Sequence, residues 1–269
     1  MLSTRGDKPR RPDTVGFHTR AVQRVISTLR ERLDESISLK EMASVAYMSR
    51  FHFNRTFREI TGLPPRRFLS ALRLEAATRM LLDTDHRVTD ICLDVGYNSL
   101  GTFIRRFSGA LGVSPMKLRS IGRSSGQGLL QQADTTSQSQ ARPECSVEGR
   151  ILAPTSFSGP IFVGLFATRI PEGAPVACTV VYSSGEFRIA AAPRGEHYLF
   201  ALGLPWPQRM SDFVSYESAL RGGGELVSVD GDKTELRDIC LRAAIPTDPP
   251  ILVNLPFLLG GKKDLPKAA

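Results

Sequence analysis

The sequence predicts a multidomain α + β protein, in which an all-α domain with two helix-turn-helix units precedes a flexible linker and an antiparallel β-sandwich. Three observations lead to this fold class. Apolar residues recur at helical steps before residue 120, a Ser/Gln/Thr/Gly-rich stretch follows, and short strand patterns separated by turns come after it. We therefore expect a helical domain at 18–122, a linker at 123–149 and a sandwich at 150–260.

The helices of the first half follow from apolar residues spaced three and four apart. Gly62 and the pair Pro64-Pro65 are expected to stop one of them. The predicted helices are Val22–Leu33, Leu39–Val45, Ser49–Ile60, Phe68–Leu82, a short helix around Val88–Cys92 and a longer one over 99–110.

An internal repeat relates two of these segments. At an offset of 50 residues, Ser49, Phe53, Arg55, Phe57, Gly62 and Pro65 return as Ser99, Phe103, Arg105, Phe107, Gly112 and Pro115. A short helix and a tight turn precede each copy. This order is typical of a helix-turn-helix unit, and the repeat therefore predicts two such units.

The first copy presents a polar face suited to DNA. At about 100° per residue, Phe53, Phe57 and Ile60 form a buried stripe, and Ser49 stands at the N-cap position. Arginine pairs with guanine, asparagine with adenine, and an apolar ring contacts the thymine methyl group. The side chains on the opposite face are those of Phe51, Asn54, Arg55 and Arg58.

The second copy has a similar core stripe and a plainer outer face. Its outward residues are Gly101, Thr102, Arg105 and Ser108, which offer fewer base contacts, so we expect it to be the weaker reader. Basic residues near helix ends are candidates for contacts with phosphate. They are Lys40, Arg106, Lys117 and Arg119.

The charge is divided unevenly between the halves. Residues 1–123 hold 22 basic and 12 acidic residues, whereas residues 124–269 hold 13 and 15. A basic first half suits a polyanion such as DNA. We expect the second half to add almost nothing to DNA affinity and the polar linker to let the halves move independently.

Residues 22–119 resemble the DNA-binding domain of AraC/XylS-type transcription regulators. The motifs that carry the resemblance are Ser49–Gly62, Leu72–Leu82, Asp90–Tyr97, Phe103–Phe107 and Gly112–Arg119. The family commonly carries this domain at the C-terminus, whereas here it comes first. The resemblance implies base contacts by the outward residues of both third helices, namely Arg50, Phe51, Asn54, Arg55, Leu100, Gly101, Thr102 and Arg105.

The same resemblance implies a function. It implies a bacterial-type, cytoplasmic, sequence-specific DNA-binding regulator that acts as an activator or a repressor. Its implied partners are double-stranded DNA and RNA polymerase, with a small-molecule effector or a protein partner at the C-terminal part.

The sequence pattern of the second half predicts strands and one short helix. Met210–Leu220 is expected to be a helix that Gly222-Gly223-Gly224 ends, and one hairpin over 185–199 resembles those of transthyretin-like, carboxypeptidase-regulatory sandwiches. The predicted strands are Ile161–Arg169, Val176–Tyr182, Glu186–Ala192, His197–Gly203, Leu226–Val229, Leu236–Arg242 and Ile251–Leu255.

No catalytic motif was found. The sequence has no Gly-x-Ser-x-Gly elbow, no phosphate loop and no Cys/His spacing suited to a metal, so we expect neither enzymatic activity nor a cofactor. The longest nearly unbroken apolar run, Ile161 to Ala167, is too short to span a membrane. Cys145 in the linker is expected to be exposed.

Two other functions remain open at this point. A nucleoid protein with little sequence preference would use its charge alone. An enzyme would use the sandwich for catalysis and the helical half for localisation.

Overall fold

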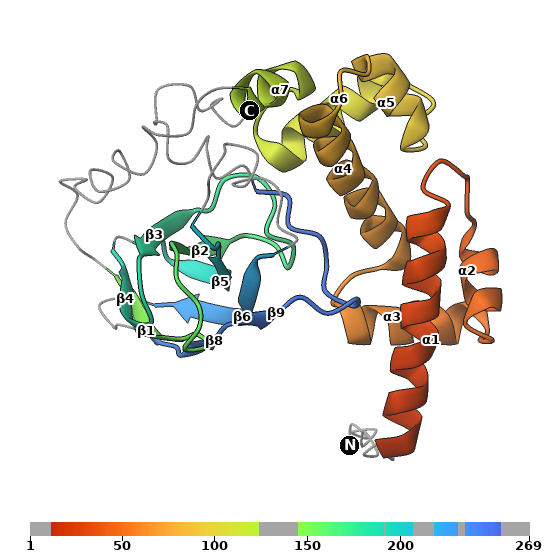
Figure 1. Ribbon diagram of the computed structural model, residues 1–269. Helices are drawn as coiled ribbons and strands as arrows, with labels where there is room; N and C mark the ends of the chain where they lie inside the picture. Colours follow the sequence, from red (N-terminus) through yellow and green to blue (C-terminus); the bar gives the residue numbers. More distant parts are fainter. Residues whose placement is uncertain (1–11, 124–144, 191, 207–217, 231–234, 254–269) are drawn as a thin grey trace.

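The computed structural model describes residues 12–123, 145–190, 192–206, 218–230 and 235–253, and its helices and strands lie in separate parts of the chain (Figure 1). The helices are α1 (Pro12–Glu31), α2 (Leu39–Val45), α3 (Arg50–Thr61), α4 (Pro65–Asp83), α5 (Val88–Asp94), α6 (Leu100–Leu111) and α7 (Pro115–Gly122). The two predicted helix-turn-helix units are α2–α3 and α5–α6, and α4 connects them (Figure 1).

The helix boundaries follow from capping chemistry. Ser49 and Ser99 accept hydrogen bonds from the backbone N–H groups of the third helical residues of α3 and α6, both at 3.4 Å. Gly62 and Gly112 end the same two helices in the left-handed conformation, at φ 77° and 73°, which glycine adopts at little cost. The 50-residue repeat is thus a repeat of structure as well as of sequence.

Two predicted helix starts are wrong, and the first is that of α1, which begins at Pro12 and not at Val22. Pro65 was expected to help stop a helix, with the next one beginning at Phe68, but Pro65 is the first residue of α4. The first residues of a helix have no intrahelical partner for their N–H groups, so proline is well tolerated there. Pro64 and Pro65 therefore start α4 as well as separate it from α3.

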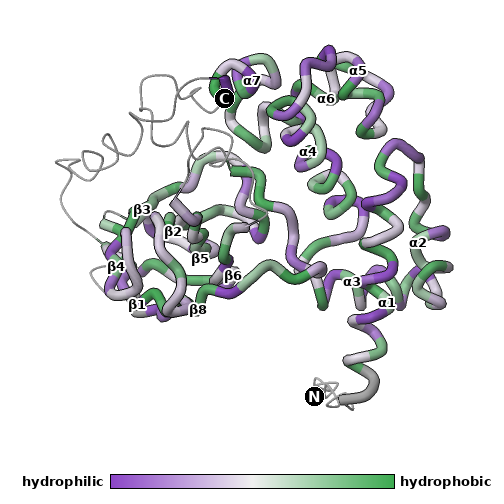
Figure 2. Tube along the Cα trace, in the orientation of Figure 1, coloured by the Kyte–Doolittle hydropathy of each residue, from purple (hydrophilic) through white to green (hydrophobic). Residues whose placement is uncertain are grey.

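The strands form two sheets around one shared core. One sheet has the order β4-β1-β7, with β8 also paired to β1, and the other has the order β3-β2-β5-β6-β9. Apolar residues follow one another along β2 and β5 (Figure 2). The strands are β1 (Val147–Leu152), β2 (Ile161–Phe166), β3 (Ala177–Val181), β4 (Gly185–Ile189), β5 (Gly195–Gly203), β6 (Leu220–Val229), β7 (Glu235–Leu236), β8 (Ile239–Cys240) and β9 (Arg242–Ala243).

The sheets differ from the predicted fully antiparallel arrangement. Strand β1, which the sequence did not predict, pairs in parallel with β7 and β8. The segment predicted as one strand over Leu236–Arg242 supplies β7, β8 and β9. Of the predicted strand Ile251–Leu255, the described residues 251–253 contribute a bridge between Leu252 and Glu172, and the rest lies outside the described residues. Cys145, expected to be exposed in the linker, is buried in the shared core just before β1.

Three consecutive glycines lie inside a strand. Gly222, Gly223 and Gly224 were expected to end a helix, but they belong to β6 opposite an irregularity in β5 at Leu199/Phe200. Gly223 has φ 85°, and a Cβ atom there would lie 2.2 Å from the Leu199 carbonyl oxygen. The chain therefore needs glycine where β6 bends. Most of the predicted helix Met210–Leu220 lies outside the described residues, and Leu220 itself begins β6.

Two segments of the β part complete the helical cores. Ile170, after β2, is 1% exposed and belongs to the buried cluster of the first unit, whereas Leu252, after β9, is 2% exposed and belongs to that of the second. The Leu252 N–H donates to the Pro171 carbonyl at 3.0 Å, and the Gly173 N–H donates to the Ala110 carbonyl at 2.5 Å. We call residues 170–173 together with Leu252 the clamp.

The clamp changes the expected relation between the halves. Glu172 forms an ion pair with Arg67 of α4 at 2.5 Å, and the segment after β9 (blue) runs between the sheets and the helices (Figure 1). The structure therefore differs from the expectation of independently moving halves, because side chains that follow the linker fill the cores that precede it.

Ile170→Ala is expected to lower the free energy of unfolding by about 2–4 kcal/mol, because it leaves a cavity in the first helical core. Hydrogen exchange of the α1 and α3 amides measures the effect where it arises. Ile245→Ala is the matched control, because Ile245 is 47% exposed, and it should cost less than about 0.5 kcal/mol. Unchanged protection of α1 and α3 in the Ile170 variant would contradict docking in solution.

Candidate nucleic-acid interface

The predicted reading residues of α3 lie on one solvent-facing side. Phe53, Thr56 and Phe57 point into the core. The Phe51 ring is 91% exposed, so the chain leaves a whole aromatic face in water beside its guanidinium groups. The other exposed residues of this surface are Arg50, Asn54, Arg55 and Arg58.

Arg55 has one weak intramolecular partner. Its Nε lies 3.1 Å from Glu59 Oε1 one turn later, and both side chains are largely exposed. Exposed pairs of this kind contribute about 0.3–0.5 kcal/mol. Arg55 can therefore leave Glu59 for a nucleobase or a phosphate at little cost.

The corresponding surface of α6 is smaller. Leu100, Gly101 and Arg105 are exposed and Thr102 is half-buried. A Cβ atom added at Gly101 would meet nothing within 4 Å, so no packing contact requires glycine there. This face offers one guanidinium group where α3 offers three, and the ranking of the two readers stays a prediction.

Arg73 joins the two units at the middle of α4. Its Nη2 donates to the Glu35 carbonyl at 2.8 Å, and its Nη1 donates to the Gly96 carbonyl in the α5–α6 turn at 2.9 Å. Burial lowers the pKa of this guanidinium from its usual value. A Cβ atom at Gly96 would lie 2.6 Å from Arg73 Nη2, so glycine in the turn and arginine on α4 fit each other.

Tyr47 is a candidate that the sequence analysis missed. It is 84% exposed in the α2–α3 turn and has φ 56°, the only positive value at a non-glycine residue within the described ranges. Gly96 occupies the equivalent place in the second turn, because the next residue makes the same hydrogen bond in both turns. The Met48 N–H donates to the Ala43 carbonyl and the Tyr97 N–H to the Cys92 carbonyl, each at 2.9 Å.

This conformation costs a non-glycine residue roughly 1–2 kcal/mol. Arg24 lies over the Tyr47 ring, 5.6 Å from its centroid. The exposed ring adjoins the predicted reading helix, which makes it a candidate contact. The sequence repeat at an offset of 50 places Tyr47 opposite Tyr97, whereas α2 and α5 are related by an offset of 49, which places it opposite Gly96. The repeat alone therefore gave no signal for Tyr47.

Of the four predicted phosphate contacts, two are exposed lysines and two are arginines that make hydrogen bonds within the protein. Lys40 and Lys117 are exposed in the first turns of α2 and α7. Arg106 reaches Ser70 Oγ at 3.4 Å. Arg119 donates to the Leu81 carbonyl at 3.2 Å and to the His86 carbonyl at 2.6 Å.

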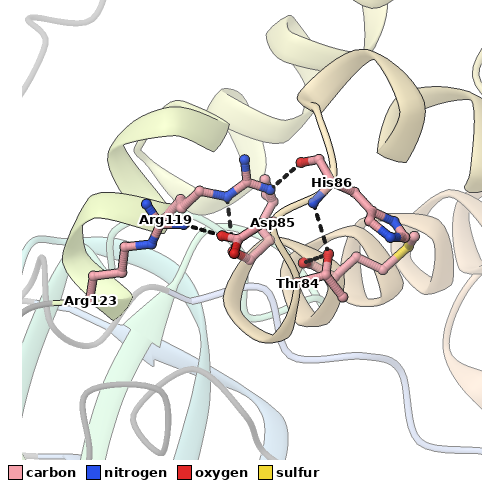
Figure 3. A network of polar contacts seen from close by, with 7 residues as sticks. Thr84, Asp85, His86, Arg119 and Arg123 are labelled. Carbon is pink, nitrogen blue, oxygen red and sulfur yellow. Dashed lines mark hydrogen bonds and ion pairs between the residues drawn. The ribbon is translucent and has the colours of Figure 1, made fainter.

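Arg119 therefore fastens α7 to the end of α4, as Figure 3 shows. Arg123 supports the same contact through an ion pair with Asp85, and the Thr84 hydroxyl accepts a hydrogen bond from the His86 N–H at 3.4 Å. The carbonyls at a helix end lack intrahelical partners, and a guanidinium satisfies them well. A basic residue near a helix end, such as Arg119, can thus hold two segments together, besides making the phosphate contact predicted for it.

Residues suited to a metal or a membrane do not come together in the part of the chain that the structure describes. No group of three or more His, Cys, Asp or Glu side chains there can hold an ion, and none of its helices is long and apolar enough to cross a bilayer.

Comparisons with known proteins point to one class of regulator. A family profile described as a helix-turn-helix domain matches residues 42–121. The Transposon Tn10 TetD protein of Escherichia coli is 30% identical over 103 residues, which are 38% of this chain and 75% of that protein. The uncharacterized regulator YbfP of Bacillus subtilis (strain 168) is 35% identical over 91 residues, which are 34% of this chain and 31% of YbfP.

A solved structure is also similar. It is the DNA-binding domain of AdpA, described as a global transcriptional factor, in complex with a target DNA. It shares 32% identity and a TM-score of 0.37, and it covers 38% of this chain and 93% of that one.

Arg119→Met is expected to destabilise the second unit by about 1–3 kcal/mol, because two carbonyls lose a charged donor. Thermal unfolding and hydrogen exchange of α7 measure this. Lys117→Met is the matched control, since its exposed ammonium should leave stability unchanged and lower the salt slope of DNA binding by about 1. Unchanged stability of Arg119→Met would contradict the structural role of Arg119, whatever it contributes to the salt slope.

Proposed function

The chain belongs to the AraC/XylS-type family of helix-turn-helix transcription regulators, and from this premise we propose that it binds a specific DNA operator through two adjacent major-groove segments. Helix α3 reads one segment and α6 reads the other. The proposed base contacts are Arg50, Phe51, Asn54, Arg55, Arg58, Leu100, Gly101, Thr102 and Arg105.

The observation that carries this proposal is the equivalent presentation of α3 and α6. Both helices have a serine N-cap, a left-handed glycine C-cap and an exposed arginine at the same position of the repeat, Arg55 and Arg105. The 19 residues of α4 between the units span about 28 Å. Successive major-groove faces on one side of a duplex are roughly 34 Å apart, so a single chain has the dimensions to reach both.

The remaining parts of the proposal concern partners. Lys40, Arg106 and Lys117 contact phosphates, and Arg119 adds to them from its position on α7. RNA polymerase is the protein partner proposed for the activating or repressing step, and the cytoplasm is the proposed location. Residues 150–260 form a β-sandwich that regulates the helical half and lacks catalytic activity of its own.

The nucleoid alternative requires a different protein surface from the one that α3 presents. A nucleoid protein needs charge alone, whereas here an exposed phenylalanine and an asparagine accompany the arginines of α3. These groups favour readout of bases over binding by charge only.

Footprinting of the full chain on its preferred operator is expected to show two protected patches about 10.5 base pairs apart on one face of the duplex. A monomer should suffice, because each chain holds both readers. The control is a duplex of the same composition in scrambled order, which should show no defined patch. A single short patch would contradict the two-reader proposal, and equal protection of both duplexes would favour the nucleoid alternative.

Arg55→Ala is expected to weaken binding to the preferred operator by about 1–3 kcal/mol and to change binding to random DNA much less. Arg105→Ala should cost less on the operator, because fewer polar groups surround it. Arg194→Ala, in an exposed turn of the β part, controls for the loss of one positive charge. Equal losses on operator and random DNA for Arg55→Ala would make Arg55 a phosphate contact.

A further inference from the structure

A cavity of about 690 Å³ lies between the five-stranded sheet and the end of α3. Its volume is in the range of small-molecule binding sites. From the helical half, Glu59–Gly62 line it. From the sheet come Phe162, Phe166 and Phe200, on the face turned away from the shared core.

The sheet side of this cavity is aromatic. The rings of Phe166 and Phe200 meet edge to face with centroids 5.8 Å apart. Leu202 and Val180 continue the apolar surface. Gly222–Gly224 of β6 also line the cavity, and the missing side chain of Gly224 leaves room beside the Phe200 ring, which a Cβ atom there would approach to 3.4 Å. An apolar or aromatic ligand body would find complementary surface there.

One cation of the lining retains an unused donor. Arg221 of β6 is half-buried, and its Nη1 donates to the Pro249 carbonyl at 3.0 Å, but its buried Nε has no hydrogen-bond partner. An unsatisfied buried donor of this kind is costly. A carboxylate entering the cavity would form a charge-assisted pair with this guanidinium.

The neighbouring charges are already engaged. Arg242 donates two hydrogen bonds of 2.8 Å to the Asp248 carboxylate. Glu59 pairs with Arg55, and Asp238 accepts the Arg150 backbone N–H at 3.0 Å. Arg169 also lines the cavity, and its guanidinium lies over the Tyr198 ring, 5.7 Å from the centroid. Among these arginines, Arg221 is the one with an unsatisfied buried donor.

We propose that this cavity binds a small organic anion, an aryl-substituted carboxylate, whose carboxylate pairs with the Arg221 guanidinium and whose ring lies on Phe166 and Phe200. The ligand acts as an effector, a role that rests on the proposed regulatory function. Because α3 and the sheet both form the wall, an occupied cavity favours the arrangement in which the halves are docked over one in which they separate.

The cysteines provide a direct test of where a ligand binds. Cys178 and Cys240 are exposed and line the cavity, whereas Cys92 and Cys145 are buried in the cores. Full-length protein is treated with N-ethylmaleimide with and without 4-phenylbutyrate, and modification is followed by mass spectrometry. We expect saturating 4-phenylbutyrate to slow modification of Cys178 and Cys240 at least fivefold.

Calorimetric titration tests the chemistry of the ligand. 4-Phenylbutyrate should bind at least tenfold more tightly than its neutral analogue 4-phenylbutanamide. Arg221→Met should remove that preference, whereas Arg194→Met, an exposed arginine outside the cavity, should keep it. Val180→Trp fills part of the cavity without changing its charge and should weaken both compounds alike, which keeps the test valid if the Arg221 variant does not fold.

Three results would overturn the inference. They are no binding of 4-phenylbutyrate, binding with unchanged modification of Cys178 and Cys240, and equal affinity for the acid and the amide. Operator binding is measured on the same samples. Protein that binds DNA but not the carboxylate refutes the effector site alone, and protein that binds the carboxylate but not DNA refutes the proposed function alone.

Discussion

Helix α4 supplies side chains to both helical cores, and the positions of the two reading helices depend on it. Phe68, Leu69 and Leu72 belong to the buried cluster of the first unit, whereas Leu74 and Leu81 belong to that of the second. A continuous helix is stiff over this length, so a shift of one unit displaces the other. Arg73 adds a polar connection at the same junction. The separation of α3 and α6 is therefore a property of one packed helix and not of a loop.

Local features of this arrangement could be predicted from the sequence. Helical periodicity, the serine N-caps and the glycine C-caps are each encoded within a few residues, and α2 spans Leu39–Val45 as predicted. The exposed faces of α3 and α6 follow from the same periodicity. The repeat at an offset of 50 then identified two equivalent units, because two copies of one pattern support each other.

Contacts between distant segments could not be predicted in the same way. Ile170 precedes a proline and looks like a loop residue, and nothing near it in the sequence indicates a partner in the first helical core. The charge of Arg119 suggested a phosphate contact, but its hydrogen bonds to the Leu81 and His86 carbonyls could not be foreseen, because every residue carries such a carbonyl. Gly222–Gly224 suggested the end of a helix, but they lie at a bend within β6. The backbone freedom of glycine suits both places, so the sequence alone does not distinguish them. The residues of the cavity likewise come from segments far apart in the sequence.

Charge and packing assign different roles to the β part. Its slightly acidic composition gives it little attraction for DNA, and the basic residues that attract phosphates lie in the helical half. Ile170 and Leu252 nevertheless fill one helical core each, and burying such a side chain contributes about 1.5–3 kcal/mol. Because the clamp packs against both units at once, the β part is tied by packing to the same arrangement that α4 sets. The proposed regulation by the β part would therefore act through this packing, which net charge does not reveal.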